Sequence, residues 1–121
     1  MLIAKMALFQ FCAKQGGYLA EIASKIEQTN LNTILRDDSQ YWIGLSDLAT
    51  EGKFVWQHSF SPLKEYTNWF PGEPNNVNNE DCVSLWPHRP QGGWGWNDER
   101  CYTYRHALCK SYIGISRYIL K

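Results

Sequence analysis

Two stretches of the chain carry apolar residues at helical spacing. In residues 4–15 the apolar positions fall on one face, and the pair Gly16-Gly17 ends the pattern. Ser24 followed by Glu27 is a capping box, which opens a second helix running to about Arg36. The spacing predicts that this helix turns four apolar side chains inward: Ile26, Leu31, Ile34 and Leu35.

Shorter apolar runs predict strands, and turn-forming residues separate them. The predicted strands are 18–22, 41–45, 54–56, 82–86 and the closing segment 102–112. Residues 59–79 contain Pro62, Pro71, Gly72 and Pro74 and are predicted to be loop, and residues 87–95 to be a turn-rich excursion. A loop of about 20 residues between strands usually has a function.

Composition narrows the class of protein. The 121 residues suit one domain, and an aromatic content of 15% is enough to build a core. Formal net charge is zero, with no long basic run and no apolar stretch long enough to span a bilayer. These features argue against nucleic acid and membrane insertion. Acidic residues gather at 37–51, 73–81 and 98–99, which favours a local cation site.

The four cysteines, Cys12, Cys82, Cys101 and Cys109, permit three pairings. No C-x-x-C spacing supports a zinc ribbon. A nested pairing would close most of the chain with one bridge and a short loop with the other, contributing about 4–5 and about 3 kcal/mol in the loop-entropy model. Four reduced thiols in a cytosolic protein are the alternative.

Oxygen-bearing side chains cluster around two short motifs. Calcium takes six to eight oxygen ligands and accepts carboxylates and amide carbonyls alike. Three of the side chains are anionic, so one divalent ion would largely neutralise them. Such a site leaves positions open for two adjacent hydroxyls of a sugar. The five candidate ligands are Glu73, Asn75, Glu80, Asn97 and Asp98.

The order of these motifs resembles the C-type lectin domain over nearly the whole chain, from about Leu8 to Lys110. The resemblance implies an α+β C-type lectin-like fold, with two helices flanking small antiparallel sheets, a long calcium- and sugar-binding loop, and two disulfides in the nested pairing, Cys12–Cys109 and Cys82–Cys101. The motifs that carry it are Gly16–Ile22, Trp42-Ile43-Gly44-Leu45, Asn68-Trp69, Glu73-Pro74-Asn75, Trp96-Asn97-Asp98 and the four cysteines.

The resemblance also assigns metal ligands. It implies that the five candidates above hold the principal calcium, that Glu73–Pro74 is a cis peptide, and that calcium is the cofactor. A second calcium would be held by residues around the first, sharing Glu80. Its further ligands are Asp47, Glu51, Asn76 and Asp81.

The Glu-Pro-Asn tripeptide resembles that of family members that bind mannose, fucose or N-acetylglucosamine, whereas Gln-Pro-Asp marks galactose binders. Each of two vicinal equatorial hydroxyls would donate to a carboxylate and accept from an amide N–H. The same five ligands would therefore contact the sugar, and Val77 would touch its ring.

The chain differs from the family's usual pattern at both ends. Residues 1–121 are predicted to form a single C-type lectin domain that lacks the family's usual first strand, with 111–121 as an extension. The apolar tail would either replace the missing strand pairing or leave an exposed edge. It also offers a surface for a non-covalent homodimer, through Ile113, Ile115, Tyr118 and Ile119.

The predicted function is calcium-dependent carbohydrate binding by a secreted lectin in innate recognition or agglutination. The alternative is a lectin-like domain that binds protein or mineral, such as shell or ice. An enzyme is disfavoured, because His58, His88 and His106 lack metal-ligand spacing and the cysteines are assigned to disulfides. Four tryptophans, Trp42, Trp56, Trp69 and Trp96, are predicted to be core. Trp86, His88 and Trp94 lie near the site in sequence; they are predicted to pack in the core or the loop, and the alternative is that they extend the site.

Overall fold

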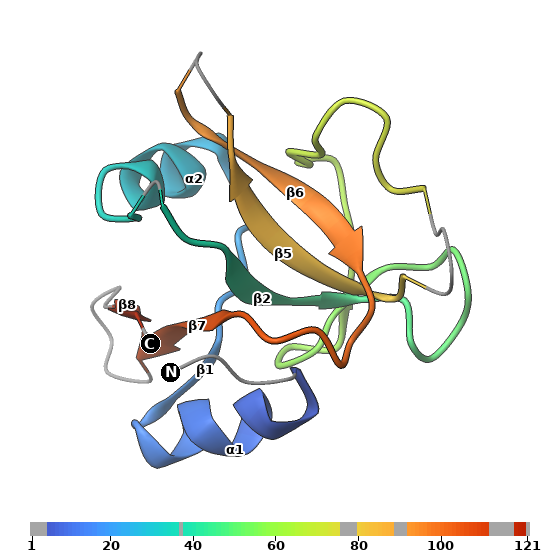
Figure 1. The fold of residues 1–121 in the computed structure, drawn as a ribbon. Helices are drawn as coiled ribbons and strands as arrows, with labels where there is room; N and C mark the ends of the chain where they lie inside the picture. Colours follow the sequence, from blue (N-terminus) through green and yellow to red (C-terminus); the bar gives the residue numbers. More distant parts are fainter. Residues whose placement is uncertain (1–4, 37, 76–79, 89–91, 112–117, 121) are drawn as a thin grey trace.

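The computed structural model of this chain describes residues 5–36, 38–75, 80–88, 92–111 and 118–120. It has two helices and short strands that join in a single branched sheet (Figure 1). No helix in these ranges is long and apolar enough to cross a membrane. The elements in chain order are α1 (Lys5–Lys14), β1 (Gly17–Leu19), α2 (Lys25–Asn32), β2 (Tyr41–Ser46), β3 (Val55–Trp56), β4 (Ser61–Pro62), β5 (Cys82–Pro87), β6 (Trp94–Glu99), β7 (His106–Ser111) and β8 (Tyr118–Leu120).

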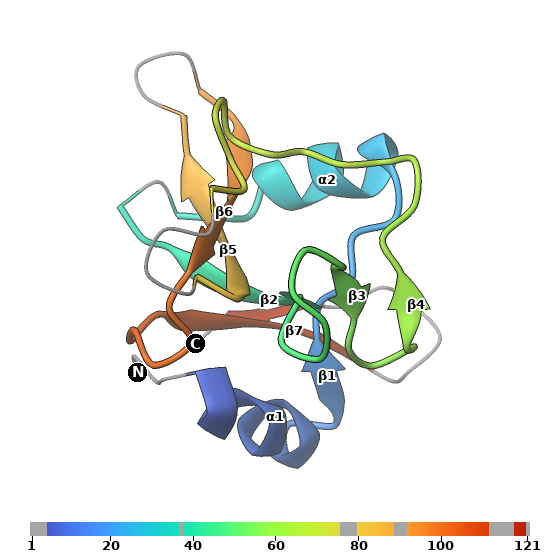
Figure 2. The ribbon, with the colours of Figure 1, turned by 90° about the vertical axis from the view of Figure 1, so that its right-hand side faces the viewer.

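The sheet runs β1-β7-β2-β3-β4, with β5 joining β2 to β6 and β8 pairing with β7. Among the described strands the pairings are antiparallel except β2 with β7, which is parallel. Figure 2 shows α1 and α2 on opposite sides of the sheet. This is the predicted α+β arrangement of two helices around small sheets, with the single parallel pair as an addition.

Strand β2 is buried along its whole length, because both of its faces are covered. Tyr41, Ile43 and Leu45 pack in the larger core below α2, whereas Trp42 packs in a smaller core against α1. Trp96 is the centre of the larger core. Its ring makes edge contacts with the rings of Trp56, Tyr66 and Trp69, and its Nε1 donates to Gln28 Oε1 at 2.9 Å.

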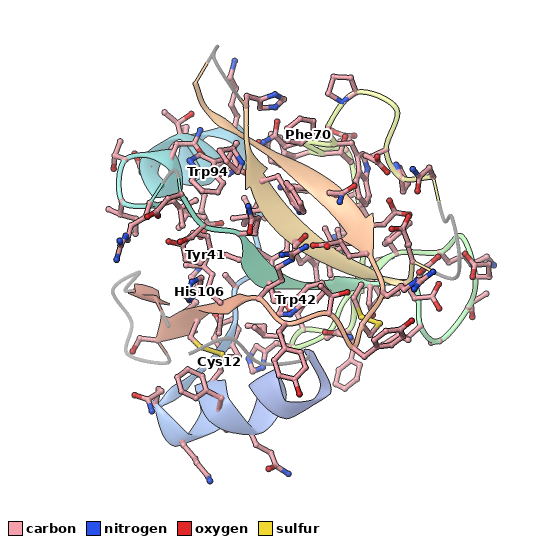
Figure 3. The ribbon with its side chains drawn as sticks, viewed as in Figure 1. Cys12, Tyr41, Trp42, Phe70, Trp94 and His106 are labelled. Atoms are coloured by element: carbon pink, nitrogen blue, oxygen red, sulfur yellow. A yellow bond between two sulfur atoms is a disulfide. The ribbon has the colours of Figure 1, made fainter. Side chains whose placement is uncertain are left out.

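Two disulfides brace these layers, in the nested pairing that the resemblance implied. Cys12–Cys109 ties α1 to β7, and Cys82–Cys101 ties the start of β5 to the segment after β6. Figure 3 labels Cys12 at the contact between α1 and the sheet. All the cysteines are in disulfides, so reduced thiols are not part of this fold.

The inward face of α2 was predicted incorrectly. Leu31 is buried and Leu35 packs on the core, but Ile26 is 75% exposed and Ile34 is 45% exposed. The helix ends at Asn32, so Ile34 lies beyond it. Gln28 faces the core instead, because its amide is satisfied there by Trp96 and Asn32.

Strand β6 was missed in the sequence, where residues 87–95 were predicted to be turns and no strand was assigned to 96–99. It pairs with β5 from Cys82↔Glu99 to Pro87↔Trp94. Within the tail, residues 118–120 form β8, whose backbone pairs with β7. The side chains of the tail lie outside the described residues, so dimerisation through them stays a prediction.

Candidate functional site

The loop that carries the Glu-Pro-Asn tripeptide is fastened to the edge of β6. Trp96 N–H donates to Asn68 O, and Phe70 N–H donates to Trp96 O, both at 2.8 Å. The Asn68 amide also donates to Trp94 O at 2.7 Å. The loop therefore runs beside β6 and delivers Glu73 to the end of that strand. Asn68 was identified in the sequence as part of a motif, but its role in attaching the loop to β6 was not predicted.

Four of the five predicted ligands are brought together at this place by hydrogen bonds. Asn75 N–H donates to Asp98 Oδ1 at 3.2 Å, and the Asn75 amide donates to Glu73 Oε2 at 3.4 Å. Asp98 is fully buried, whereas Asn75 is exposed. Glu80 is half-buried, and its charge acts on Glu73. Glu73–Pro74 is a cis peptide, as predicted.

The carboxylates of this cluster act on one another. Burial, and then Asp98 and Glu80 as neighbours, raise the pKa of Glu73 from 4.5 to about 7. Carboxylates held this close repel one another when ionised, and a divalent cation would remove that repulsion. The donor set is therefore the kind that a hard cation stabilises.

The side-chain amide of Asn97 also faces Glu73. With its nitrogen turned toward that carboxylate, Nδ2 donates to Glu73 Oε1 and Oε2, each at 3.2 Å. Asn97 therefore joins Glu73, Asn75 and Asp98 at this place.

A second acidic cluster follows β2. Carboxylate oxygens of Asp47, Glu51 and Asp81 all lie within 4.8 Å of one another. Asp47 is 3% exposed, and its Oδ2 accepts from Gly52 N–H at 2.9 Å. Asp47 Oδ1 and Asp81 Oδ1 are buried, and neither has a hydrogen-bond partner among the residues that the structure describes. Two buried acceptors without donors in an anionic cluster fit a bound cation.

The pKa values of two carboxyls in this cluster are raised. Hydrogen bonding to Asp47, then burial and the charges of Asp47 and Asp81, raise the pKa of Glu51 from 4.5 to about 7. Burial, followed by the charge of Asp47, raises the pKa of Asp81. Asn76, predicted as a further ligand, and Val77, predicted to touch the sugar, lie outside the described residues.

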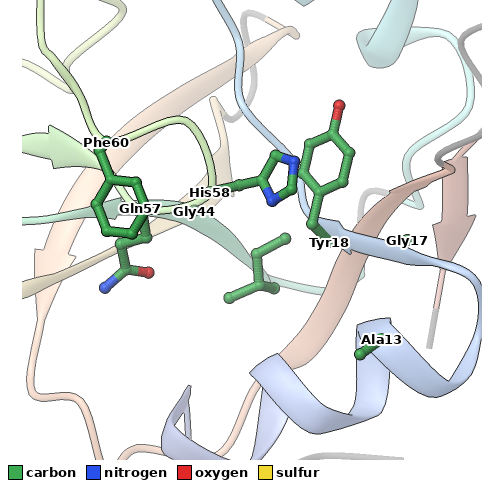
Figure 4. Close-up of a pocket in the computed structure, with 8 residues that line it drawn as sticks. Ala13, Gly17, Tyr18, Gly44, Gln57, His58 and Phe60 are labelled. Atoms are coloured by element: carbon green, nitrogen blue, oxygen red, sulfur yellow. The ribbon is translucent and has the colours of Figure 1, made fainter.

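Of the predicted core tryptophans, Trp42, Trp56 and Trp96 are buried, whereas Trp69 is half-buried and packs against the larger core. Trp94 is also buried, at 5% exposure. The structure also contains a cavity of about 280 Å³ between α1, β1 and the turn after β3 (Figure 4). Tyr18 and His58 stack beside it, with ring centroids 3.8 Å apart. None of the described residues that line this cavity carries a carboxylate, so its described lining differs chemically from the two acidic clusters.

Comparison with known sequences places the chain in a family. The family described as Lectin C-type domain matches residues 7–111. Salivary C-type lectin 2 of Aedes albopictus is 36% identical over 110 residues, which cover 84% of this chain and 72% of that protein. Mannose-binding protein of Gallus gallus is 43% identical over 90 residues, which cover 74% of this chain and only 33% of that protein.

Solved structures give the same fold. The C-type lectin domain of murine dendritic cell inhibitory receptor 2, determined in complex with N-glycan, has a TM-score of 0.76 and 30% identity, covering 86% of this chain and 78% of that one. A calcium-independent type II antifreeze protein has a TM-score of 0.75 and 25% identity, covering 89% of this chain and 78% of that one.

Proposed function

This chain belongs to the C-type lectin domain family, and from that premise we propose that it binds carbohydrate in a calcium-dependent manner. The proposed ligands are glycans that present vicinal equatorial hydroxyls, as mannose, fucose and N-acetylglucosamine do. The proposed principal calcium ligands are Glu73, Asn75, Glu80, Asn97 and Asp98. Among the described residues, the proposed ligands of a second calcium are Asp47, Glu51 and Asp81.

The observation that carries the proposal is the convergence of Glu73, Asn75, Asn97 and Asp98 at the end of β6. Bound calcium would supply the open coordination positions that two adjacent sugar hydroxyls fill. The carboxylates of Glu73 and Glu80 would each accept a hydrogen bond from a sugar hydroxyl. The amides of Asn75 and Asn97 would each donate an N–H to a hydroxyl oxygen. The protein's part is to orient two hydroxyls by this pattern of donors and acceptors.

A mannose column tests the proposal directly. We expect the protein to be retained in calcium and eluted both by a chelator and by free mannose, because the metal and the hydroxyls complete one site. Retention that persists in excess chelator would contradict calcium-dependent binding. A lack of retention in calcium would contradict mannose-type binding.

Calcium affinity is expected to fall as the pH falls from 8 to 5. Glu73 and Glu51 have pKa values of about 7 in the metal-free folded protein, against 4.5 as their ordinary value. Calcium requires both carboxylates deprotonated, so protons compete with it over this range. Calcium titrations at several pH values provide the measurement, and equal affinity at pH 8 and pH 5 would rule out ligation by these carboxylates.

The stability of the metal-free protein should change in the opposite direction. Because the folded-state pKa values are raised, these two groups contribute their full stability below about 4.5. They lose that contribution as the pH rises through about 7. Thermal midpoints in chelator should therefore show this loss with rising pH. Replacing Glu51→Gln should reduce the dependence, whereas Glu65→Gln, at an exposed carboxyl, should leave it unchanged.

Sugar preference is expected to follow the tripeptide. The double substitution Glu73→Gln with Asn75→Asp exchanges the donor and acceptor sides of the site, so it should move preference from mannose toward galactose. A glycan array, with calcium affinity measured in parallel, checks this. A galactose-to-mannose ratio that stays at the wild-type value, in a variant that still binds calcium, would show that these two residues do not set selectivity.

We also propose where the protein acts and in which process. We take residues 1–121 as one lectin domain acting outside the cell in recognition or agglutination, with no catalytic step and no nucleic acid or membrane insertion. Two disulfides and a salivary relative support an extracellular setting. The structural similarity to an antifreeze protein supports a second candidate function, that of a lectin-like domain that binds ice, mineral or protein. The buried, unpartnered oxygens of Asp47 and Asp81 favour the calcium-dependent candidate.

A further inference from the structure

The cavity beside the Tyr18–His58 stack shares no described residue with either acidic cluster. Its volume is about 280 Å³, and Figure 4 shows the ring of Phe60 on one side of it and the rings of His58 and Tyr18 on the other. An apolar cavity of about 150 Å³ is large enough to hold benzene. This cavity is therefore large enough for a bicyclic aromatic molecule, with aromatic rings on two sides to contact it.

The described lining favours a neutral ligand. None of the described residues that line the cavity is a lysine, arginine, aspartate or glutamate. A ligand with a full charge would lose its hydration on entry without meeting an opposite charge, which is unfavourable. The chemistry of the lining therefore suits an uncharged ring better than an ion.

The turn after β3 presents Phe60 in a fixed but unfavourable conformation. Its φ of 58° lies in the left-handed region, which a bulky residue seldom adopts. Two hydrogen bonds hold the turn: Ser59 N–H donates to Glu21 Oε2 at 2.9 Å, and Ser61 N–H donates to Ser59 Oγ at 3.3 Å. The ring of Phe60 is nevertheless 84% exposed. Backbone strain of this kind is concentrated at functional sites, and a ligand in the cavity would cover part of this ring.

Gln57 gives the cavity a hydrogen-bond acceptor. Its backbone N–H donates to Gly44 O at 2.8 Å, and its Nε2 donates to Ser46 Oγ at 2.7 Å. Its Oε1 is buried and has no hydrogen-bond partner among the residues that the structure describes. A buried acceptor without a donor is destabilising. Because the last side-chain torsion of glutamine is soft, a small rotation would turn this oxygen toward the cavity.

We propose that this cavity is a binding site for a small neutral aromatic molecule that carries one N–H or O–H donor, as indole does. The ring of the ligand lies between Phe60 and His58, and its donor pairs with Gln57 Oε1. Calcium takes no part in this binding, because the described lining has no carboxylate to hold it. The site is therefore independent of the proposed sugar site.

The test compares indole with benzofuran, which has nearly the same shape but an oxygen in place of the N–H. Binding is followed by NMR, through the backbone amide resonances of the labelled protein. We expect the wild type to bind indole about tenfold more tightly than benzofuran, as one additional buried hydrogen bond would give. The resonances that move should include those of Gly44 and His58, and the affinities should be equal in calcium and in chelator.

Three variants locate the site. Gln57→Met removes the acceptor at similar size, so it should bring the two ligands to equal affinity and leave the affinity for benzofuran unchanged. Ala13→Trp places a large side chain at the cavity from an exposed position on α1, and it should weaken both ligands at least about tenfold. Tyr104→Ser removes a ring that is 62% exposed in the segment after β6, and it should behave as wild type.

The amide spectrum of each variant shows whether it is folded. Failure of both ligands to bind the wild type at millimolar concentration would overturn the site, as would binding that folded Ala13→Trp protein leaves unchanged. Equal affinity of the wild type for indole and benzofuran would overturn the hydrogen bond to Gln57. Mannose retention, measured on the same proteins, should be unaffected by Ala13→Trp, so failure of this inference is distinguishable from failure of the proposed function.

Discussion

Replacing Asp98 with asparagine should lower calcium affinity by at least about 100-fold and abolish retention on mannose. Asp98 is fully buried at the end of β6, and its Oδ1 accepts from Asn75 N–H. Asparagine keeps the shape and one oxygen that can accept that hydrogen bond, but it removes the negative charge and one oxygen from the proposed ligand set. The loss should therefore fall on metal binding rather than on folding.

The same substitution should not destabilise the metal-free protein. Glu73 and Asp98 repel one another in the absence of a cation, so removal of one charge relieves that repulsion. Thermal melts with and without calcium separate the two effects. At about 100 times the dissociation constant, calcium should stabilise the wild type by about 2.7 kcal/mol, and at the same concentration stabilise the variant by only about 0.4 kcal/mol.

Asp38→Asn is the matched control, since Asp38 is an exposed carboxylate paired with Arg36. It makes the same chemical change away from either acidic cluster and should leave calcium stabilisation unchanged. Asp98→Asn protein that still responds to calcium and binds mannose would remove Asp98 from the ligand set. A variant that is unfolded even in the metal-free state would instead give Asp98 a structural role.

The resemblance predicted that Glu73, Asn75, Asn97 and Asp98 lie together, and the structure brings them together at the end of β6. Their role as calcium and sugar ligands stays a prediction. The inward face of α2 was predicted less well. Ile26 was misplaced because apolar spacing alone could not show that Gln28 would be satisfied inside the core by Trp96. A buried polar group with a distant partner leaves no periodic signal.

Strand β6 was missed for a related reason. Trp94, Trp96 and Asp98 alternate with Gly95, Asn97 and Glu99, but glycine and acidic residues are depleted in strands. They are tolerated here because each has a specific use: Gly95 admits two rings, Glu99 binds Arg105, and Asp98 joins the loop. The contact between Asp47 and Asp81 likewise depends on β2 pairing with β5, which spacing does not reveal.

The removal of the Cys12–Cys109 disulfide, by changing both residues to alanine, should cost about 4.7 kcal/mol of folding free energy in the loop-entropy model. The two residues are 97 apart in sequence, so the crosslink restricts nearly the whole unfolded chain. Domains of this kind are stable by only about 5–15 kcal/mol, so the thermal midpoint should fall by on the order of 15 °C. Both cysteines are fully buried in the smaller core, which adds a packing loss of the same sign.

The matched control is the double alanine variant at Cys82 and Cys101, which are 19 apart. That shorter loop should cost about 3 kcal/mol. In calcium affinity the order should be reversed, with the larger loss in the variant that lacks the Cys82–Cys101 bond. Cys82 directly follows Asp81, whereas Cys12 lies on α1, away from both acidic clusters. Calcium titrations well below the melting transition would show this reversal. If loss of the Cys82–Cys101 bond destabilised the fold more, loop entropy would not be the main contribution of these disulfides, and local bracing of β5 against the segment after β6 would take its place.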